Sequence, residues 1–138
     1  MQYTLHLSVL DLETLHYHAE SRRPQEAAAL LFGKISETSV IVTRVELVGN
    51  EATSSLTSFV VNPEEQYRLM IEAEEKEEEL VGIFHSHPAP PYPSSRDKEN
   101  MKLNPVVWLI ASKETGDWVS MAYIMGDHEI ETVILQLT

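Results

Sequence analysis

Apolar residues in this sequence recur at alternate positions or in short continuous runs, a pattern that predicts more strands than helices. The run Glu26–Gly33 is apolar after its first residue and is too short for a comfortable helix between a proline and a glycine, so it indicates a buried strand. Val40–Val48 is rich in β-branched residues and should pair with it as a hairpin. The expected strands are Tyr3–Leu7, Glu26–Gly33, Val40–Val48, Ser55–Val61, Leu80–His87, Val106–Ser112, Asp117–Met125 and Glu129–Leu137.

Three helix starts interrupt this pattern. Ser8 and Asn62 are suitable N-caps, and Asn62 is followed by proline at the first helical position and by a glutamate three residues later. Tyr67, Met70 and Ile71 are expected to mark the inner face of the second helix. The expected helices are Val9–Ser21, a helix from Pro63 to about Glu78, and a short helix that begins at Ser94 and ends near Lys102.

The order of these elements predicts an α/β (α+β mixed) fold in which a mixed sheet is covered by helices. A chain of 138 residues with 43% hydrophobic content is expected to form one domain, residues 1–138. The sheet is expected to have exposed edges. Its apolar last strand, Thr132–Leu137, would tolerate a homodimer.

Charge and composition narrow the classes of partner. The formal net charge of −12 repels phosphate backbones and anionic membrane surfaces, so neither nucleic acid nor membrane is an expected partner. The chain contains no cysteine, so a metal would have to be held by nitrogen and oxygen ligands. No signal-type segment or spanning apolar run is present, which predicts a cytoplasmic, soluble protein.

The strongest candidate for chemistry is the end of the strand Leu80–His87. Side chains alternate along a strand, so His85 and His87 point to the same face and can bind one ion, while Ser86 points the other way. Imidazole and carboxylate suit Zn²⁺, and Asp97 is the natural third ligand. Each part also has a purely structural interpretation: the histidines as a solvent-facing pair, and Ser94 with Asp97 as a helix capping box.

The remaining histidines are weaker candidates. His16 and His18 lie two apart on a predicted helix and diverge, whereas His16 and Glu20 are one turn apart and are expected to form an exposed pair. His6 and His128 have no partner nearby in sequence and are expected at the surface or satisfied in the core.

A zinc hydrolase also needs a general base, for which the residues alone leave several glutamates open. A charge at the start of a buried strand requires an explanation, either a catalytic role or a place at the strand's exposed end. The eligible residues are Glu26, Glu64, Glu65 and Glu99.

Glu26 before an apolar strand, then His85-Ser86-His87-Pro88 and Ser94-x-x-Asp97, resembles the signature of the JAMM (MPN+) metalloproteases. The resemblance covers most of the chain and implies an MPN/JAMM domain with a curved mixed sheet of cytidine-deaminase-like architecture. It implies that His85, His87 and Asp97 bind one Zn²⁺ with a catalytic water. It also implies that Glu26 is the base and that Ser94 supports the water or the oxyanion.

One departure from the family pattern concerns a loop. Six residues, 88–93, separate His87 from Ser94, where the family has seven. Ser95 would restore that spacing but leaves only one residue before Asp97, so Ser94 is preferred.

Such enzymes hydrolyse the amide or isopeptide bond after the C-terminal diglycine of ubiquitin-like modifiers, which are therefore the expected partners. The resemblance further indicates a stand-alone prokaryotic member of archaeal type. Two alternatives within the family are a peptidase that processes sulfur-carrier proteins and a catalytically inactive MPN scaffold. A zinc deaminase is excluded, because the pattern of those enzymes includes cysteines and this chain has none.

Overall fold

The computed structural model describes residues 2–50, 61–88, 90–113 and 116–138. Within them the chain forms seven strands and three helices. The elements are β1 (Thr4–Leu7), α1 (Val9–Arg22), β2 (Ala28–Ser36), β3 (Ser39–Val48), α2 (Pro63–Glu75), β4 (Glu79–Ser86), α3 (Ser95–Leu103), β5 (Val107–Ser112), β6 (Val119–Met125) and β7 (Ile130–Leu137). These elements match the expected ones closely, although α2 ends three residues early. The strand expected at 55–61 falls outside the described residues up to position 60.

The strands form a closed barrel in the order β1-β3-β2-β4-β5-β6-β7. β1 pairs in parallel with both β3 and β7, β4 pairs in parallel with β5, and the remaining pairs are antiparallel. The expectation of exposed sheet edges was therefore wrong, because β7 pairs with β6 along its first half and with β1 along its second. The parallel β1–β7 pairing joins the first and last strands, and no local sequence pattern predicts it. The homodimer stays a prediction.

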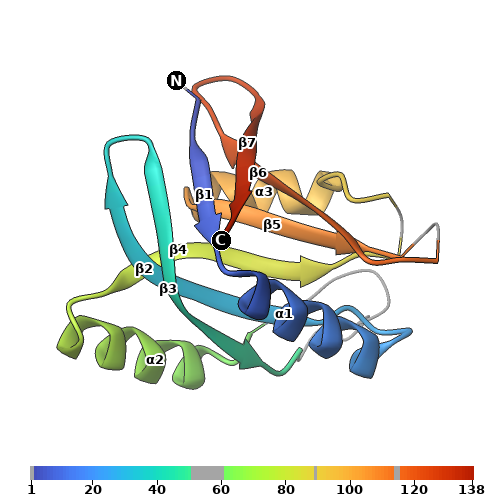
Figure 1. Cartoon of the computed structure of the whole chain (residues 1–138), viewed down its shortest axis with the longest axis horizontal. Coiled ribbons are helices and arrows are strands. Elements are labelled where there is room, and N and C mark those ends of the chain that lie inside the picture. Colours follow the sequence, from blue (N-terminus) through green and yellow to red (C-terminus); the bar gives the residue numbers. More distant parts are fainter. Residues whose placement is uncertain (1, 51–60, 89, 114–115) are drawn as a thin grey trace.

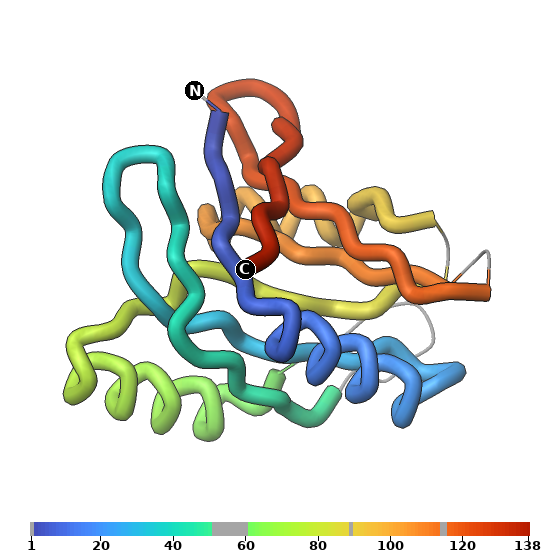
Figure 2. Tube along the Cα trace, viewed as in Figure 1, coloured from blue at the N-terminus to red at the C-terminus, as the bar shows by residue number. Residues whose placement is uncertain are grey.

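The middle of the barrel is buried on both faces by the helices (Figures 1 and 2). One core contains Leu15 and Ala19 of α1 together with residues such as Ala29 and Phe84 of the strands. The other contains Leu69 of α2, Met101 of α3 and the alternate strand residues. Burial on both faces explains why β2, β4 and β5 read as continuous apolar runs.

α2 buries a different face from the one expected. Leu69 and Ala73 are buried, whereas Tyr67 is 69% exposed and Met70 and Ile71 lie at the surface. Leu69 and Ala73 are one turn apart, and the small alanine lets the helix lie close to the sheet. The contact with the sheet, and not the size of the apolar side chains, therefore decides which face of α2 is buried.

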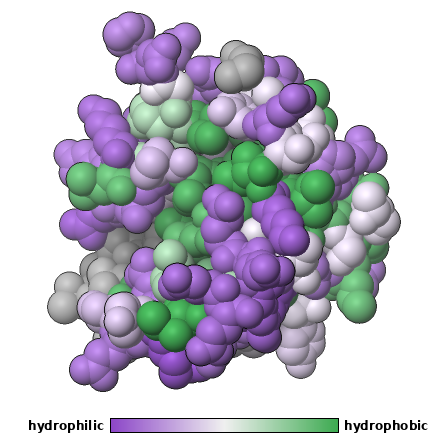
Figure 3. Space-filling model, turned by 90° about the vertical axis from the view of Figure 1, so that its left-hand side faces the viewer, coloured by the Kyte–Doolittle hydropathy of each residue, from purple (hydrophilic) through white to green (hydrophobic). Residues whose placement is uncertain are grey.

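β2 carries a register shift at Gly33, where the hairpin with β3 bends. A Cβ atom on Gly33 would lie 1.8 Å from the carbonyl oxygen of Ile41, so only glycine fits this close approach. Apolar side chains gather in the middle of the face at this end of the molecule, with polar side chains around them (Figure 3). No helix among the described residues is long and apolar enough to cross a membrane.

Candidate metal centre

The site forms where β2 begins and β4 ends. The antiparallel register pairs Ala28 with His85, and the Ser86 amide donates to the Ala27 carbonyl at 3.0 Å. Continuing this register by two residues places Glu26 opposite His87. Glu26, His85 and His87 therefore face the same side of the sheet, the side covered by α3.

α3 brings Asp97 to the same place through its capping box. The Asp97 amide donates to Ser94 Oγ at 3.1 Å, and the Ser94 amide donates to Asp97 Oδ2 at 2.8 Å. Asp97 is 5% exposed, and its Oδ1 lies 3.4 Å from His85 Nε2, while Oδ2 lies 3.9 Å from His87 Nε2. The capping and ligand interpretations of this aspartate are thus compatible, since the cap fixes the carboxylate beside both histidines.

These distances allow a test of whether the side chains fit zinc. Zinc bonds of about 2.0–2.1 Å in a tetrahedron place neighbouring ligand atoms about 3.3 Å apart. The His85–Asp97 separation of 3.4 Å meets this, and the His87–Asp97 separation of 3.9 Å requires a small approach. Among residues 2–50, 61–88, 90–113 and 116–138, no three such side chains are already arranged around a common ion position. The donor set fits zinc after that movement.

The charges around His85 are unusual for a buried imidazole. Burial alone would lower the pKa of His85, but the carboxylates of Asp97 and Glu26 outweigh it and raise this pKa to about 9. Burial would raise the pKa of Asp97, but His85 and the Ser94 hydrogen bonds lower it to about 2. Without metal, the cluster is therefore held together as an imidazolium between two carboxylates, and a cation can take the place of that proton.

Glu26 is only 3% exposed, which rules out the interpretation that it lies at an exposed strand end. Its Oε1 lies 3.2 Å from His85 Nδ1, and its buried Oε2 has no hydrogen-bond partner in the described part of the chain. A buried carboxylate oxygen without a partner is costly and needs an explanation in function. The orphaned oxygen is available to a water or a substrate amine.

The backbone around Glu26 is fixed by side chains that the sequence did not single out. Ser86 Oγ accepts from the Ala27 amide at 2.8 Å, and the Asn50 amide group donates to the Glu26 carbonyl at 2.8 Å. His18 Nε2 donates to the Ala28 carbonyl at 3.0 Å, and burial lowers the pKa of His18. The backbone of residues 26–28 is therefore held by Asn50, which follows β3, by Ser86 of β4 and by His18 of α1.

The other candidates lie elsewhere. Glu64 and Glu65 belong to the first turn of α2, and Glu99 is exposed on α3. Ser95 is exposed at the first position of α3, whereas half-buried Ser94 is its N-cap, with Oγ occupied as an acceptor and its O–H still able to donate. The structure brings Glu26, His85, His87, Ser94 and Asp97 together.

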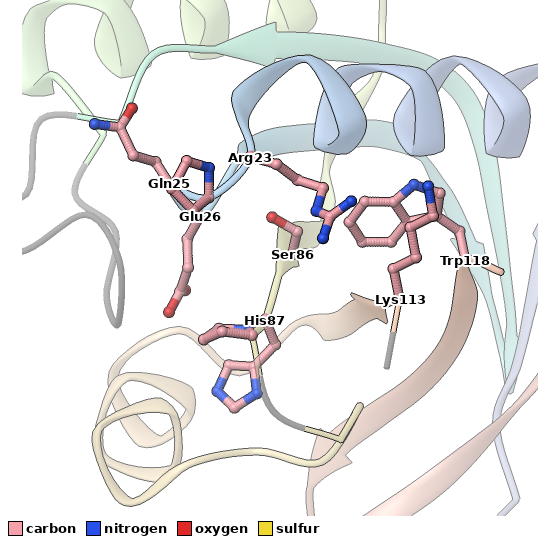
Figure 4. A pocket seen from close by; sticks show the side chains of 9 residues that line it. Arg23, Gln25, Glu26, Ser86, His87, Lys113 and Trp118 are labelled. Atoms are coloured by element: carbon pink, nitrogen blue, oxygen red, sulfur yellow. The ribbon is translucent and has the colours of Figure 1, made fainter. Parts of the chain in front are cut away.

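A cavity of about 160 Å³ opens beside Glu26 and His87, and sequence reasoning missed it. Figure 4 shows Glu26 and His87 at one end and Arg23, Lys113 and Trp118 at the other, with Ser86 between them. Sequence patterns gave no signal for this grouping, because it joins α1 to the β5–β6 connection across more than 90 positions of sequence.

Residues 11–124 match the family described as prokaryotic homologs of the JAB domain. A desampylase from Pyrococcus furiosus is 42% identical over 103 residues, 74% of this chain and 68% of that protein. A desampylase from Haloferax volcanii is 30% identical over 92 residues, 66% of this chain and 65% of that protein.

Among solved structures, the solution structure of a protein from Desulfitobacterium hafniense has 28% identity and a TM-score of 0.85, covering 98% of this chain and 93% of that one. The sequence and fold comparisons agree with the resemblance carried by the histidine and serine–aspartate motifs. This chain belongs to the family of prokaryotic JAB-domain homologs, the JAMM type.

Proposed function

We propose that this protein is a zinc-dependent isopeptidase or peptidase that cleaves after the C-terminal diglycine of a ubiquitin-like modifier. The observation that carries the proposal is the convergence of His85, His87 and Asp97 beside a buried glutamate whose Oε2 has no hydrogen bond in the described residues. Its kinship with two proteins named desampylase supports hydrolysis of modifier conjugates. The family resemblance also supports a cytidine-deaminase-like architecture.

His85, His87 and Asp97 would hold the zinc, which when bound lowers the pKa of a coordinated water toward neutrality and polarises the scissile carbonyl. Glu26 Oε2 would accept a proton from the attacking water and return it to the leaving amine. The Ser94 hydroxyl, which accepts from the Asp97 amide and can still donate, would stabilise the developing oxyanion.

An alternative role for Glu26 is to orient the His85 ring rather than to take a proton from the water. Its Oε1 lies beside His85 Nδ1, as carboxylates that orient a metal-binding histidine do. The two roles make different demands: an orienting carboxylate sustains metal affinity, whereas a base sustains turnover. Both are possible at once, because the two oxygens point to different partners.

The test separates these roles. Zinc content by elemental analysis and hydrolysis of a diglycine-linked fusion are measured for wild type and Glu26→Gln. The base role predicts that Glu26→Gln retains zinc and loses roughly 10²–10⁴-fold in kcat. A role confined to orienting His85 predicts a loss of zinc affinity of roughly 10–100-fold, with activity restored by excess zinc.

If protein refolded in the presence of zinc holds no metal, the proposed zinc-dependent activity is refuted and the inactive scaffold is favoured. Cleavage of a sulfur-carrier fusion but not of modifier conjugates would select the sulfur-carrier alternative.

A further inference from the structure

The proposed chemistry involves only one end of the cavity beside Glu26. It continues from Glu26 and His87 past Ser86 to Arg23, Lys113 and Trp118, and it holds about 160 Å³. A water in the liquid occupies about 30 Å³, so the cavity has room for a single side chain and not for a folded segment. Its occupant would lie against the candidate base at one end and two cations at the other (Figure 4).

The far end of the cavity is built by side chains that hold one another. Trp118 Nε1 donates to Glu20 Oε1 at 3.1 Å, and its ring stacks on His16 with centroids 6.1 Å apart. His16 Nε2 in turn lies 2.7 Å from Ser120 Oγ. The indole is thus fixed by α1 and β6 before any ligand arrives.

Glu20 also places the two cations of the cavity. It pairs with Lys113 Nζ and, at 3.5 Å, with Arg23 Nη1. Among the described residues, one carboxylate is paired with these two cations, which gives this end of the cavity a positive charge although the whole chain carries −12. Local positive charge on a strongly acidic protein favours an anionic ligand at that spot.

We infer that this cavity binds an acidic side chain that follows the scissile bond, on the side of the leaving amine. The inference rests on the proposed function. Glu26 returns the proton to the amine, so the amine must lie next to Glu26, and the cavity is the space that continues from Glu26. In a linear peptide substrate, a carboxylate on the side chain of the residue that supplies the amine would extend toward Arg23 and Lys113, with its methylene groups against Trp118.

The experiment uses zinc-loaded protein and linear fusion substrates that differ only in the residue directly after the diglycine: Glu, Ala or Lys. The kcat/KM for the Glu substrate should exceed that for the Ala substrate about tenfold, because charge-assisted hydrogen bonds at a half-exposed site give modest selectivity. The kcat/KM for the Lys substrate should be lower than that for the Ala substrate. Added salt should reduce the preference.

Two variants locate the preference. Arg23→Gln and Lys113→Gln should each bring the Glu-to-Ala ratio close to 1. Lys34→Gln is the matched control, because Lys34 is exposed at the opposite end of β2, and it should keep the wild-type ratio.

Equal kcat/KM for the Glu and Ala substrates would overturn the inference and leave the proposed function intact. A second series of fusions varies only the residue directly before the diglycine. A preference for an acid there, but not after the diglycine, would show that the cavity does not receive the leaving side. If zinc-loaded protein cleaves isopeptide-linked conjugates but none of the linear fusions, this inference fails and the proposed function stands. If it cleaves neither kind of substrate, both fail.

Discussion

The candidate site has two ends that are built in opposite ways. At the end with the candidate metal ligands, Glu26, His85 and Asp97 are almost fully buried and are fixed by strand register and a helix cap. At the far end of the neighbouring cavity, Lys113 and Glu20 are partly exposed and are held mainly by each other and by Trp118. Groups that must keep a metal within tenths of an ångström need rigid backbone, whereas groups that select among substrates can tolerate solvent and movement. The contrast predicts large effects on chemistry from the buried end and modest effects on selectivity from the open end.

The largest effect is expected from Asp97→Asn. The amide oxygen can still accept in the capping box of α3, but the substitution removes the charge of a proposed metal ligand. Zinc should therefore be lost, and activity should fall roughly 10³-fold. Elemental analysis, turnover of a diglycine fusion and thermal unfolding measure the three properties. Full zinc content and activity in this variant would remove Asp97 from the ligand set.

The next effect concerns pH. His85 without metal has a pKa raised to about 9 from its ordinary 6.5, so its contribution to stability is complete below pH 6.5 and is lost as pH rises through about 9. The Tm of zinc-free protein should therefore fall across this window. Zinc must displace the same proton, so its apparent affinity should rise up to about tenfold per pH unit in that range.

A chelator competition at several pH values checks this prediction, with Tm measured in parallel. Asp97→Asn removes one of the two carboxylates that raise the pKa of His85, so its Tm decline should begin at lower pH. A flat affinity between pH 6.5 and 9 would mean that His85 is not protonated in the metal-free protein.

Ser86→Ala should have a smaller effect, because Ser86 lies between the two ends. Loss of the hydroxyl leaves the buried Ala27 amide without its acceptor, which should cost about 1–3 kcal/mol of the free energy of unfolding. Glu26 would also be less well fixed, so kcat should fall while zinc content stays unchanged. Ser86→Thr is the matched control, since it keeps the acceptor. If Ser86→Ala leaves both stability and kcat unchanged, the hydrogen bond does not position the base.

The smallest change in stability is expected from Glu20→Gln. Its contacts with Lys113 and Arg23 are exposed ion pairs, so the free energy of unfolding should change little. The Glu-to-Ala substrate ratio should nevertheless shift, because Lys113 and Trp118 lose their shared anchor. A large loss of stability with an unchanged ratio would show that this end of the cavity is structural.

Much of the site was predictable from local patterns. Strand alternation placed His85 and His87 on one face, and the spacing of Ser94 and Asp97 predicted the helix start that holds the carboxylate. Glu26 was different, because the residues alone left four glutamates open and only the family resemblance selected one. The burial that makes Glu26 distinctive depends on Ser86, Asn50 and α1. Of these, only the end of α1 lies near Glu26 in the sequence.

The sequence by itself determined the elements and the local geometry of the candidate metal ligands, because period-two alternation and capping involve residues a few positions apart. Tertiary structure decided the closure of the barrel, the buried face of α2, the orphaned oxygen of Glu26 and the cavity around Trp118. Those features depend on contacts between residues far apart in the sequence, such as His85 with Glu26, Trp118 with Glu20 and Thr4 with Ile134. Such contacts form only when the whole sheet has closed and both its faces are covered, so no local pattern encodes them.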